Sequence, residues 1–475
     1  MNEIEKKYSA IDASCRLPLL VLFGVSALWL MVGLVLAIIA SLVFHKPEMF
    51  GSCPMMTYGR LLPAANDAIL YGFAIPAALG VMLWVFARLS ESELMLPLVP
   101  IVAGNLWALG VFVGVAAILI GDSTGFTWLE FPRAASTLIF AAFLLIATSA
   151  MATFGARRER LLQPSHWFLL ASLFWFPWIY STANLFLVAW PVRGVAQSVI
   201  DWWFSNNLLF VWLGLVGLGV AFYLISKISG RPLQRHYFAA FAFWSFILFA
   251  PWCGIPQGAP VPSWLPSASA VASFLTLIPL ISVAIVFFRS ICGVNVVCKG
   301  GPYCYAKFAT VAFLLSALMY LATGCSHFSS VVGMTWYMPA QMYLQIFGFF
   351  TVAICGAIYE ALPGVMDFEL PFRGFVRAGH WMLMLGLLFL VLPLAIGGIG
   401  EGLKMRNPNI PFHDISQGTL IYLKVATLGL CFLLLSSLML AANIFTMTAT
   451  WKLKLVKSFL AVFASWNAET PEVKS

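Results

Sequence analysis

The chain contains six histidines, and histidine is the residue type best suited to metal binding or proton transfer. Neutral imidazole ligates most transition metals, and its pKa near neutrality suits it to proton transfer. We place none of the six in the middle of an apolar segment, and we interpret them as polar anchors at segment ends or in connections. His327, near the end of its segment, is the best remaining candidate for a ligand or a proton carrier. The others are His45, His166, His236, His380 and His413.

Two carboxyl groups in apolar surroundings are the next candidates. Asp67 lies early in the second apolar segment of the chain, and Glu360 lies near the end of the tenth. Charge inside a membrane is costly and often functional. Because both residues lie near a segment end, we favour interfacial hydrogen bonding, and a proton or ion path through Asp67 and Glu360 stays open as the alternative.

The nine cysteines form no CxxC or CxxCH motif. These motifs are the usual sequence signatures of thiolate zinc sites and of covalently attached c-type heme. The sequence therefore supports neither kind of site.

Composition shows what must position these side chains. Of the 475 residues, 62% are hydrophobic and 9% are charged, whereas a soluble domain carries about 25% charged residues. Such a chain cannot cover a water-facing surface, so we predict an all-α polytopic membrane protein. The net charge of +8 is spread over the connections, which points to membrane topology and not to nucleic-acid binding.

Twelve apolar segments divide the chain, and crossing a bilayer takes about 20 residues. We predict a cytoplasmic N-terminal segment at 1–16, a membrane domain at 17–447 and a cytoplasmic tail at 448–475. With the N-terminus inside, 19 of the 26 Lys and Arg residues fall on the inner side and 7 on the outer side, which places both termini in the cytoplasm. The twelve segments are 17–44, 64–89, 94–121, 134–155, 167–190, 202–226, 237–254, 264–288, 308–328, 336–362, 379–400 and 419–447.

Short phrases in several segments resemble subunit I of the heme-copper oxidases, and in particular the C family, the cbb-type oxidases. FGFF at 347–350 and GAIYEALP at 356–363 resemble the tenth helix of that subunit. The resemblance covers residues 58–403 and implies the twelve-helix bundle of that family. The other phrases, in the same order as in the family, are YGRLLP at 58–63, DWWFSNN at 201–207, FYLI at 222–225, GHW at 379–381 and GIGEGL at 398–403.

The resemblance also implies where the family binds heme b and copper, and here all six expected histidines are replaced. Ala65 and Tyr343 stand at the low-spin heme positions, and Gln341 stands at the high-spin heme position. None of the substitutes offers the imidazole nitrogen that iron and copper favour, so we expect no cofactor. The three copper positions hold Asn206, Gly254 and Ile255.

One further position matches. Tyr320 aligns with the redox-active tyrosine of the family. A lone tyrosine in a membrane helix serves packing more often than catalysis, and we interpret it in that way.

These expectations together predict a heme-free and copper-free, non-catalytic subunit of a respiratory electron-transfer complex in a bacterial cytoplasmic membrane. The resemblance implies other membrane subunits as partners, c-type cytochrome subunits among them, and lipid around the bundle. A transporter or a proton or ion channel on the same scaffold is one alternative. An active terminal oxidase with displaced ligands is another.

The replaced heme-ligand positions also lead to an expectation about packing. Protein interiors are close-packed, so a lost heme site must be filled. We predict that Tyr343 turns toward the second segment and that its hydroxyl pairs with Asn66, Asp67 or another buried polar group. We also predict that Gln341 points inward and finds a partner such as Asn206 or Asn207. A polar cluster would then join the second, sixth and tenth segments.

Overall fold

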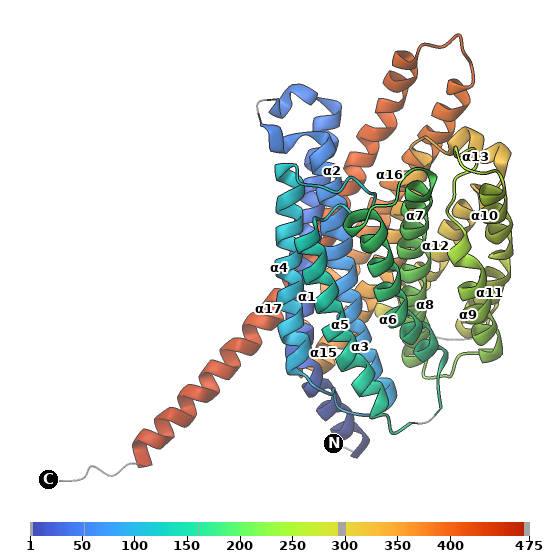
Figure 1. The fold of residues 1–475 in the computed structure, drawn as a ribbon. Helices are drawn as coiled ribbons and strands as arrows, with labels where there is room; N and C mark the ends of the chain where they lie inside the picture. The colour runs from blue at the N-terminus through green and yellow to red at the C-terminus, as the bar shows by residue number, and fades with distance from the viewer. Residues whose placement is uncertain (1–2, 52, 160, 293–300, 470–475) are drawn as a thin grey trace.

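The computed structural model of the chain describes residues 3–51, 53–159, 161–292 and 301–469, and helices account for nearly all of its regular structure. The helices stand side by side in a bundle (Figure 1). Their bounds are α1 Glu3–His45, α2 Tyr58–Asp67, η3 Ala68–Ala74, α3 Ile75–Ser90, α4 Leu98–Ile120, α5 Arg133–Gly155, α6 Pro164–Ala183, η4 Asn184–Ala189, α7 Val195–Asn206, η5 Asn207–Trp212, α8 Leu213–Ser229, α9 His236–Phe249, η6 Ala250–Trp252, α10 Trp264–Leu275, α11 Leu277–Ile291, α12 Pro302–Ala322, α13 Ser326–Val332, α14 Tyr337–Tyr343, η7 Leu344–Thr351, α15 Val352–Met366, α16 Arg373–Met405 and α17 Phe412–Glu469.

The predicted apolar segments all fall on helices. In the described part of the chain, eleven continuous helical runs are long and apolar enough to cross a membrane. The seventh predicted segment, 237–254, coincides with a shorter apolar helix, His236–Trp252. The prediction of a polytopic all-α bundle is therefore confirmed, whereas a count of twelve crossings stays a prediction.

Three spans form the centre of the bundle. The most apolar stretches of Tyr58–Ser90 and Val195–Ser229 are completely buried, and that of Tyr337–Met366 is 89% buried, whereas the other long spans are at most half buried there. These are the second, sixth and tenth predicted segments. The positions at which we expected lost ligands thus lie mainly on the most enclosed helices.

Each central span also contains a π-helical stretch. The stretch is η3 in the second span, η5 in the sixth and η7 in the tenth. Each begins within three residues of a position named above, namely Ala65, Asn206 or Gln341. A π-helical turn rotates the following side chains relative to a regular α-helix and frequently occurs at functional sites.

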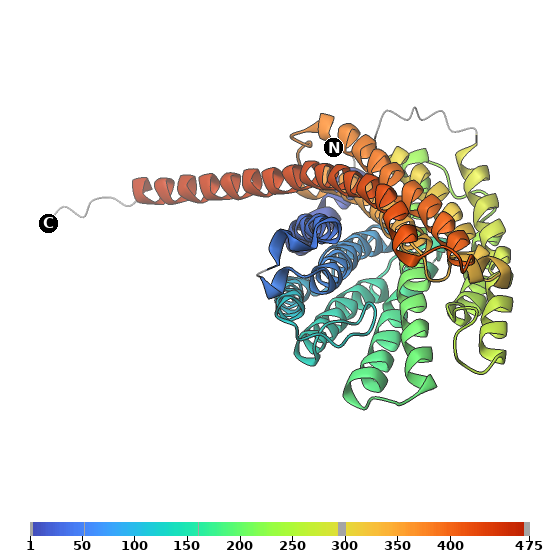
Figure 2. The same ribbon diagram turned by 90° about the horizontal axis from the view of Figure 1, so that it is seen from above.

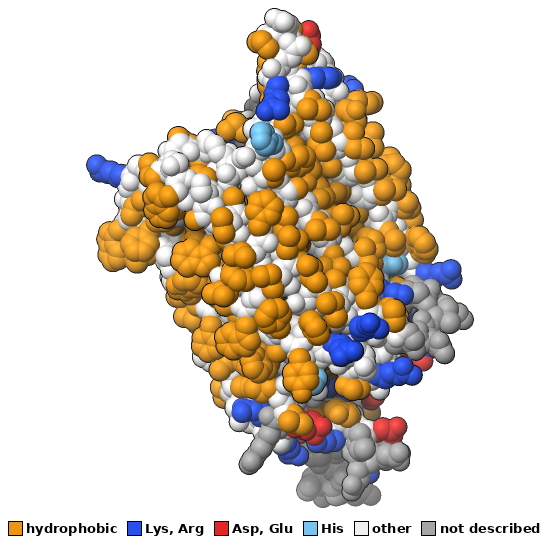
Figure 3. Space-filling model, turned by 90° about the vertical axis from the view of Figure 1, so that its right-hand side faces the viewer, with side chains coloured by type: hydrophobic (Ala, Val, Ile, Leu, Met, Phe, Trp, Pro, Cys, Tyr) orange, Lys and Arg blue, Asp and Glu red, His pale blue; other side chains and the backbone are white. Residues whose placement is uncertain are grey.

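The outer helices give the bundle an apolar coat. Hydrophobic side chains cover most of the face shown in Figure 3, and Lys and Arg side chains gather mostly toward its lower end. Large exposed side chains include Leu98, Val102 and Phe112 of α4. A lipid-facing surface has this pattern, because lipid tails solvate apolar groups and polar head groups solvate the cations.

The ends of the chain continue the first and last spans as helices. Helix α1 already begins at Glu3, and α17 runs through 58 residues to Glu469. The predicted boundaries at 16 and 447 therefore lie inside continuous helices. The C-terminal part of α17 extends away from the bundle in both views (Figures 1 and 2).

Candidate functional site

A cavity of about 280 Å³ lies where α7, α12 and α14 meet, and it brings together several positions that the sequence singled out. Asn206, Gly254, Tyr320 and Gln341 all line it. Its remaining wall is formed by Thr127, Asp201, Trp202, Ser205, Leu209, Phe210, Pro256, Gly333, Met338, Met342 and Gln345.

A hydrogen-bonded pair occupies one side of this cavity. The hydroxyl of Tyr320 donates to Oδ1 of Asn206 over 2.7 Å. Nδ2 of Asn206 donates to the carbonyl oxygen of Ala250 over 3.0 Å. The amide of Asn206 therefore has a protein partner at both ends, and Tyr320 contributes structure here.

The other two copper positions supply no metal donor. Gly254 has a φ of +103°, which favours glycine. A Cβ at Gly254 would lie 2.5 Å from Cβ of Asn206, so a side chain there would displace Asn206. Ile255 is apolar, and its backbone N–H donates to Oγ of Ser269. An amide already satisfied by protein, a glycine and an isoleucine do not fit copper.

Two glutamines of the tenth span behave differently from one another. Gln345 is satisfied, because Ser316 donates to its Oε1 and its Nε2 donates to the carbonyl oxygen of Leu209. Gln341 is 5% exposed and lines the cavity. Its side-chain amide has no hydrogen-bond partner among the residues that the structure describes. Gln341 does point inward, but the expected pairing with Asn206 is not formed.

Tyr343 lies in a different space from Gln341. It lines a cavity of about 50 Å³ together with Tyr58, Leu62 and Trp336. Tyr58 and Leu62 belong to the second span, and residues of α1, α16 and α17 form most of the remaining wall. No hydrogen bond joins the Tyr343 hydroxyl to Asn66, Asp67 or another described polar group, so the expected pairing is absent. Asn207, the other partner that we expected for Gln341, accepts a hydrogen bond from Trp175.

The low-spin heme position is closed by packing. Ala65 is completely buried. A Cβ at Gly33 of α1 would lie 2.7 Å from Ile69 and 3.2 Å from the carbonyl oxygen of Ala65, so the two helices are in direct contact. A space of about 50 Å³ beside Tyr343 is far smaller than a porphyrin. The residues around Ala65 and Tyr343 therefore do not fit a heme.

A row of three acids, two of them buried, lies next to the large cavity. Asp67 is completely buried, and neither of its carboxyl oxygens has a hydrogen-bond donor in the described part of the chain. Glu130, in the connection between α4 and α5, lies beside Asp67 and interacts electrostatically with it. Burial raises the pKa of Glu130 to about 7. Asp201, which interacts electrostatically with Glu130, extends the row to the cavity.

Sequence reasoning missed Glu130 because it lies in a connection between two spans. The connection folds back onto the bundle. Tyr71 donates to the carbonyl oxygen of Trp128, and Trp128, Leu129 and Phe131 are buried. The run WLEF at 128–131 was the available signal, since three large apolar residues in a connection favour burial.

The remaining polar candidates are separate from the cavity. Glu360 forms a 3.0 Å ion pair with Lys227 of α8. His327 is exposed on the short helix α13. Within the described ranges, no three His, Cys, Asp or Glu side chains converge as a metal site would need.

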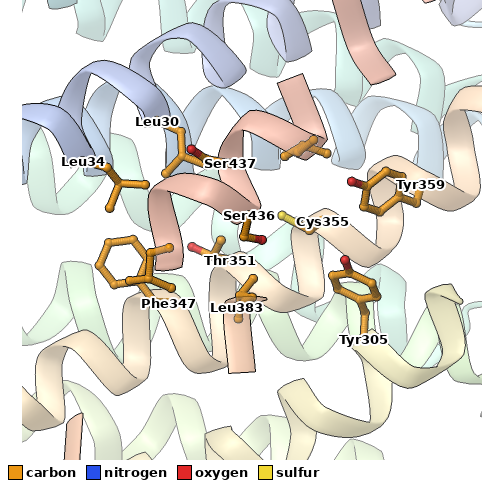
Figure 4. A pocket seen from close by; sticks show the side chains of 12 residues that line it. Leu30, Leu34, Tyr305, Phe347, Thr351, Cys355, Tyr359, Leu383, Ser436 and Ser437 are labelled. Atoms are coloured by element: carbon orange, nitrogen blue, oxygen red, sulfur yellow. The ribbon is translucent and has the colours of Figure 1, made fainter. Parts of the chain in front are cut away.

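A further cavity, between α1, α12, α15, α16 and α17, is too small to be a ligand site. Figure 4 shows Tyr305, Thr351, Cys355 and Tyr359 around it. Its volume is about 10 Å³. This space is enough for one water molecule at most.

The family model described as "Cytochrome C and Quinol oxidase polypeptide I" matches residues 18–431 of this chain. A cbb3-type cytochrome c oxidase subunit CcoN1 of Stutzerimonas stutzeri is 20% identical over 416 residues, covering 85% of this chain and 86% of the relative. A cytochrome c oxidase subunit 1 homolog of Agrobacterium tumefaciens (strain T37) is 22% identical over 428 residues, covering 84% and 76%. A chain of a heme-copper terminal oxidase dimer solved by cryo-EM is similar in fold, with a TM-score of 0.66, 15% identity and coverage of 94% and 84%.

Proposed function

The chain belongs to the family described as cytochrome c and quinol oxidase polypeptide I, and we propose that it acts there as a non-catalytic membrane subunit that binds neither heme nor copper. The observation that carries the proposal is the hydrogen bond from Tyr320 to Asn206. Because of this hydrogen bond, the side chain of Asn206, which stands at a copper-ligand position, already has a protein partner. A buried amide that is satisfied by protein partners is stable without a metal.

The packing around Ala65 supports the same proposal. The close approach of α1 to the backbone at Ala65 and the small space beside Tyr343 are both consistent with a chain that holds no low-spin heme. The family fold is kept although the ligand set is replaced, which is expected when the outer surfaces still assemble with other subunits. We infer that the partners are membrane subunits of a respiratory complex in a bacterial cytoplasmic membrane, c-type cytochrome subunits among them.

The test is the cofactor content of the protein purified in mild detergent. A pyridine hemochrome spectrum and metal analysis are expected to show neither stoichiometric heme b nor copper. Co-purifying chains with covalently bound heme would identify the respiratory partners. Stoichiometric heme b with copper would overturn the proposal, and cyanide-sensitive oxygen consumption with reduced cytochrome c would establish a working oxidase with displaced ligands.

A second candidate is proton or ion conduction on the same scaffold, and one observation favours it. Asp67 is completely buried with no hydrogen-bond donor in the described structure, and Glu130 lies beside it. Buried acids of this kind line proton paths in membrane proteins. Purified protein in liposomes would then dissipate an imposed proton gradient, and Asp67→Asn would abolish the flux. No flux above that of empty liposomes would exclude this candidate.

A further inference from the structure

The large cavity carries a negative charge with no cation to balance it. Asp201 is the one charged residue in its wall, and Lys, Arg and His are absent from the residues that line it. Oδ1 of Asp201 is buried and has no hydrogen-bond partner in the described structure. Glu130 lies close enough to interact electrostatically with Asp201. Asp201 is half-buried, and the backbone N–H of Thr127 serves only part of its carboxylate. The unpaired, buried oxygen is costly, so the wall favours a positively charged occupant.

A second group in the wall lacks a partner independently of Asp201. Gln341 is 5% exposed as a whole residue, it lines the cavity, and its side-chain amide forms no hydrogen bond with any described residue. Buried amides almost always have partners. Its carbonyl oxygen is therefore available to accept a bond from an occupant of the cavity.

The rest of the wall is suited to an organic body more than to a bare ion. Trp202 and Phe210 present aromatic rings, and Met338 and Met342 present thioethers. The face of an aromatic ring attracts an ammonium group, and tryptophan does so best. One carboxylate with neutral amides is a poor shell for a hard divalent cation, which prefers several carboxylate oxygens.

We propose that this cavity binds one small organic cation, an ammonium or quaternary ammonium compound, held by the carboxylate of Asp201, the amide oxygen of Gln341 and the ring of Trp202. The cavity volume of about 280 Å³ accommodates such a molecule. The proposal goes beyond the structural role of the subunit, and it holds whether or not the chain binds heme elsewhere.

A pair of probes with the same shape isolates the charge. Choline and 3,3-dimethylbutan-1-ol differ by the replacement of the quaternary nitrogen with carbon. We expect titration calorimetry on the full chain in detergent to show one choline bound per chain, with an affinity roughly tenfold or more above that for the neutral alcohol. Equal affinities, or no binding of choline, would overturn the proposal and leave a hydrated cavity.

Two variants place the probe in the cavity. Asp201→Asn keeps the side-chain size and removes the charge, so choline affinity should fall roughly tenfold or more. Asp122→Asn is the matched control, because Asp122 is exposed in the connection that also carries Glu130, and its choline affinity should equal that of the unchanged protein. Gln341→Leu tests the second contact if Asp201→Asn fails to fold. Unchanged choline affinity in a folded Asp201→Asn variant would contradict the proposal.

Discussion

The hydroxyl of Tyr320 and Oδ1 of Asn206 are joined by a 2.7 Å hydrogen bond that links α12 to the end of α7. Asn206 in turn donates to the carbonyl oxygen of Ala250, at the start of η6. Three elements distant in sequence are thereby connected at the edge of one cavity. The relationship explains why a tyrosine is useful at position 320 in a chain whose copper positions hold no metal ligand.

Removing this bond should destabilise the protein modestly. Tyr320→Phe deletes the donor and leaves Oδ1 of Asn206 facing the cavity, where water can reach it. We expect a loss of about 1 kcal/mol, which is typical of one hydrogen bond, measured as a lower midpoint of thermal unfolding in detergent. Tyr237→Phe is the control, because Tyr237 is 77% exposed. An equal midpoint for both variants would show that the bond contributes nothing.

The sequence was sufficient to locate the apolar helices and to identify three residues that lie around one cavity. Runs of apolar residues located the helices because a membrane requires them, and the positions of Asn206, Gly254 and Gln341 do converge on one cavity. The likeness of short phrases, and not periodicity, located those positions. Helix identity is encoded locally, so it can be inferred from a single chain.

The individual side-chain partners could not be predicted. Tyr343 and Gln341 are two residues apart, yet they line different cavities. The π-helical stretch that starts at Leu344 lies directly after them, and it has no clear sequence signature. Glu130 reaches Asp67 only because a connection folds back. Side-chain rotamers, and connections that fold back onto the bundle, depend on contacts with residues distant in sequence. The periodicity of apolar residues carries no information about those contacts.

Two ion pairs, Asp12 with Arg88 and Glu360 with Lys227, should contribute differently to stability. Asp12 of α1 is 2% exposed and accepts bonds from Arg88 and Trp84 of α3. Asp12→Ala strands a guanidinium that is largely buried, so we expect a loss of about 3 kcal/mol.

Glu360→Ala provides the comparison. Glu360 and Lys227 are each 26% exposed, and water can solvate whichever charge remains, so we expect a loss of about 1 kcal/mol or less. Unfolding midpoints of the two variants measure the difference. A larger loss for Glu360→Ala would indicate a role for Glu360 beyond this ion pair.

Stability should depend on pH through Glu130. Burial raises the pKa of Glu130 from 4.5 to about 7, so the folded chain holds a proton that the unfolded chain releases. The contribution to stability is complete below about pH 4.5 and is lost as the pH rises through about 7, and it amounts to about 3 kcal/mol. Glu130→Gln, which mimics the protonated acid, should flatten this part of the pH profile of the unfolding midpoint. A profile that keeps its slope in the variant would assign the effect to other groups.

Restoring the low-spin ligands should not restore the heme. Ala65→His with Tyr343→His would put imidazoles at both low-spin heme positions that the resemblance implies. However, α1 approaches the backbone at Ala65 closely at Gly33, and the space beside Tyr343 is only about 50 Å³. We therefore expect no heme absorption band after reconstitution of the double variant with hemin. A stoichiometric band would show that α1 and α2 separate readily and would weaken the packing argument.

The phrase GIGEGL at 398–403 contains three glycines, and the structure assigns them different importance. A Cβ at Gly398 would overlap the backbone nitrogen of Tyr337, and a Cβ at Gly402 would overlap the carbonyl oxygen of Val331. Both contacts are with backbone, which cannot rotate away as a side chain can. By contrast, a Cβ at Gly400 would meet no atom within 4 Å. Glycines spaced by four residues let membrane helices approach closely.

Alanine at each glycine separates close packing from helix propensity. Gly398→Ala and Gly402→Ala should each lose about 2 kcal/mol or more, because α16 must move away from α13 and α14. Gly400→Ala should be neutral or gain up to about 1 kcal/mol, since alanine is the better helix former. Unfolding midpoints of the three variants in the same detergent measure the contrast. If all three shift equally, the glycines act through helix propensity alone, and the close approach of α16 to the start of the tenth span is not needed for stability.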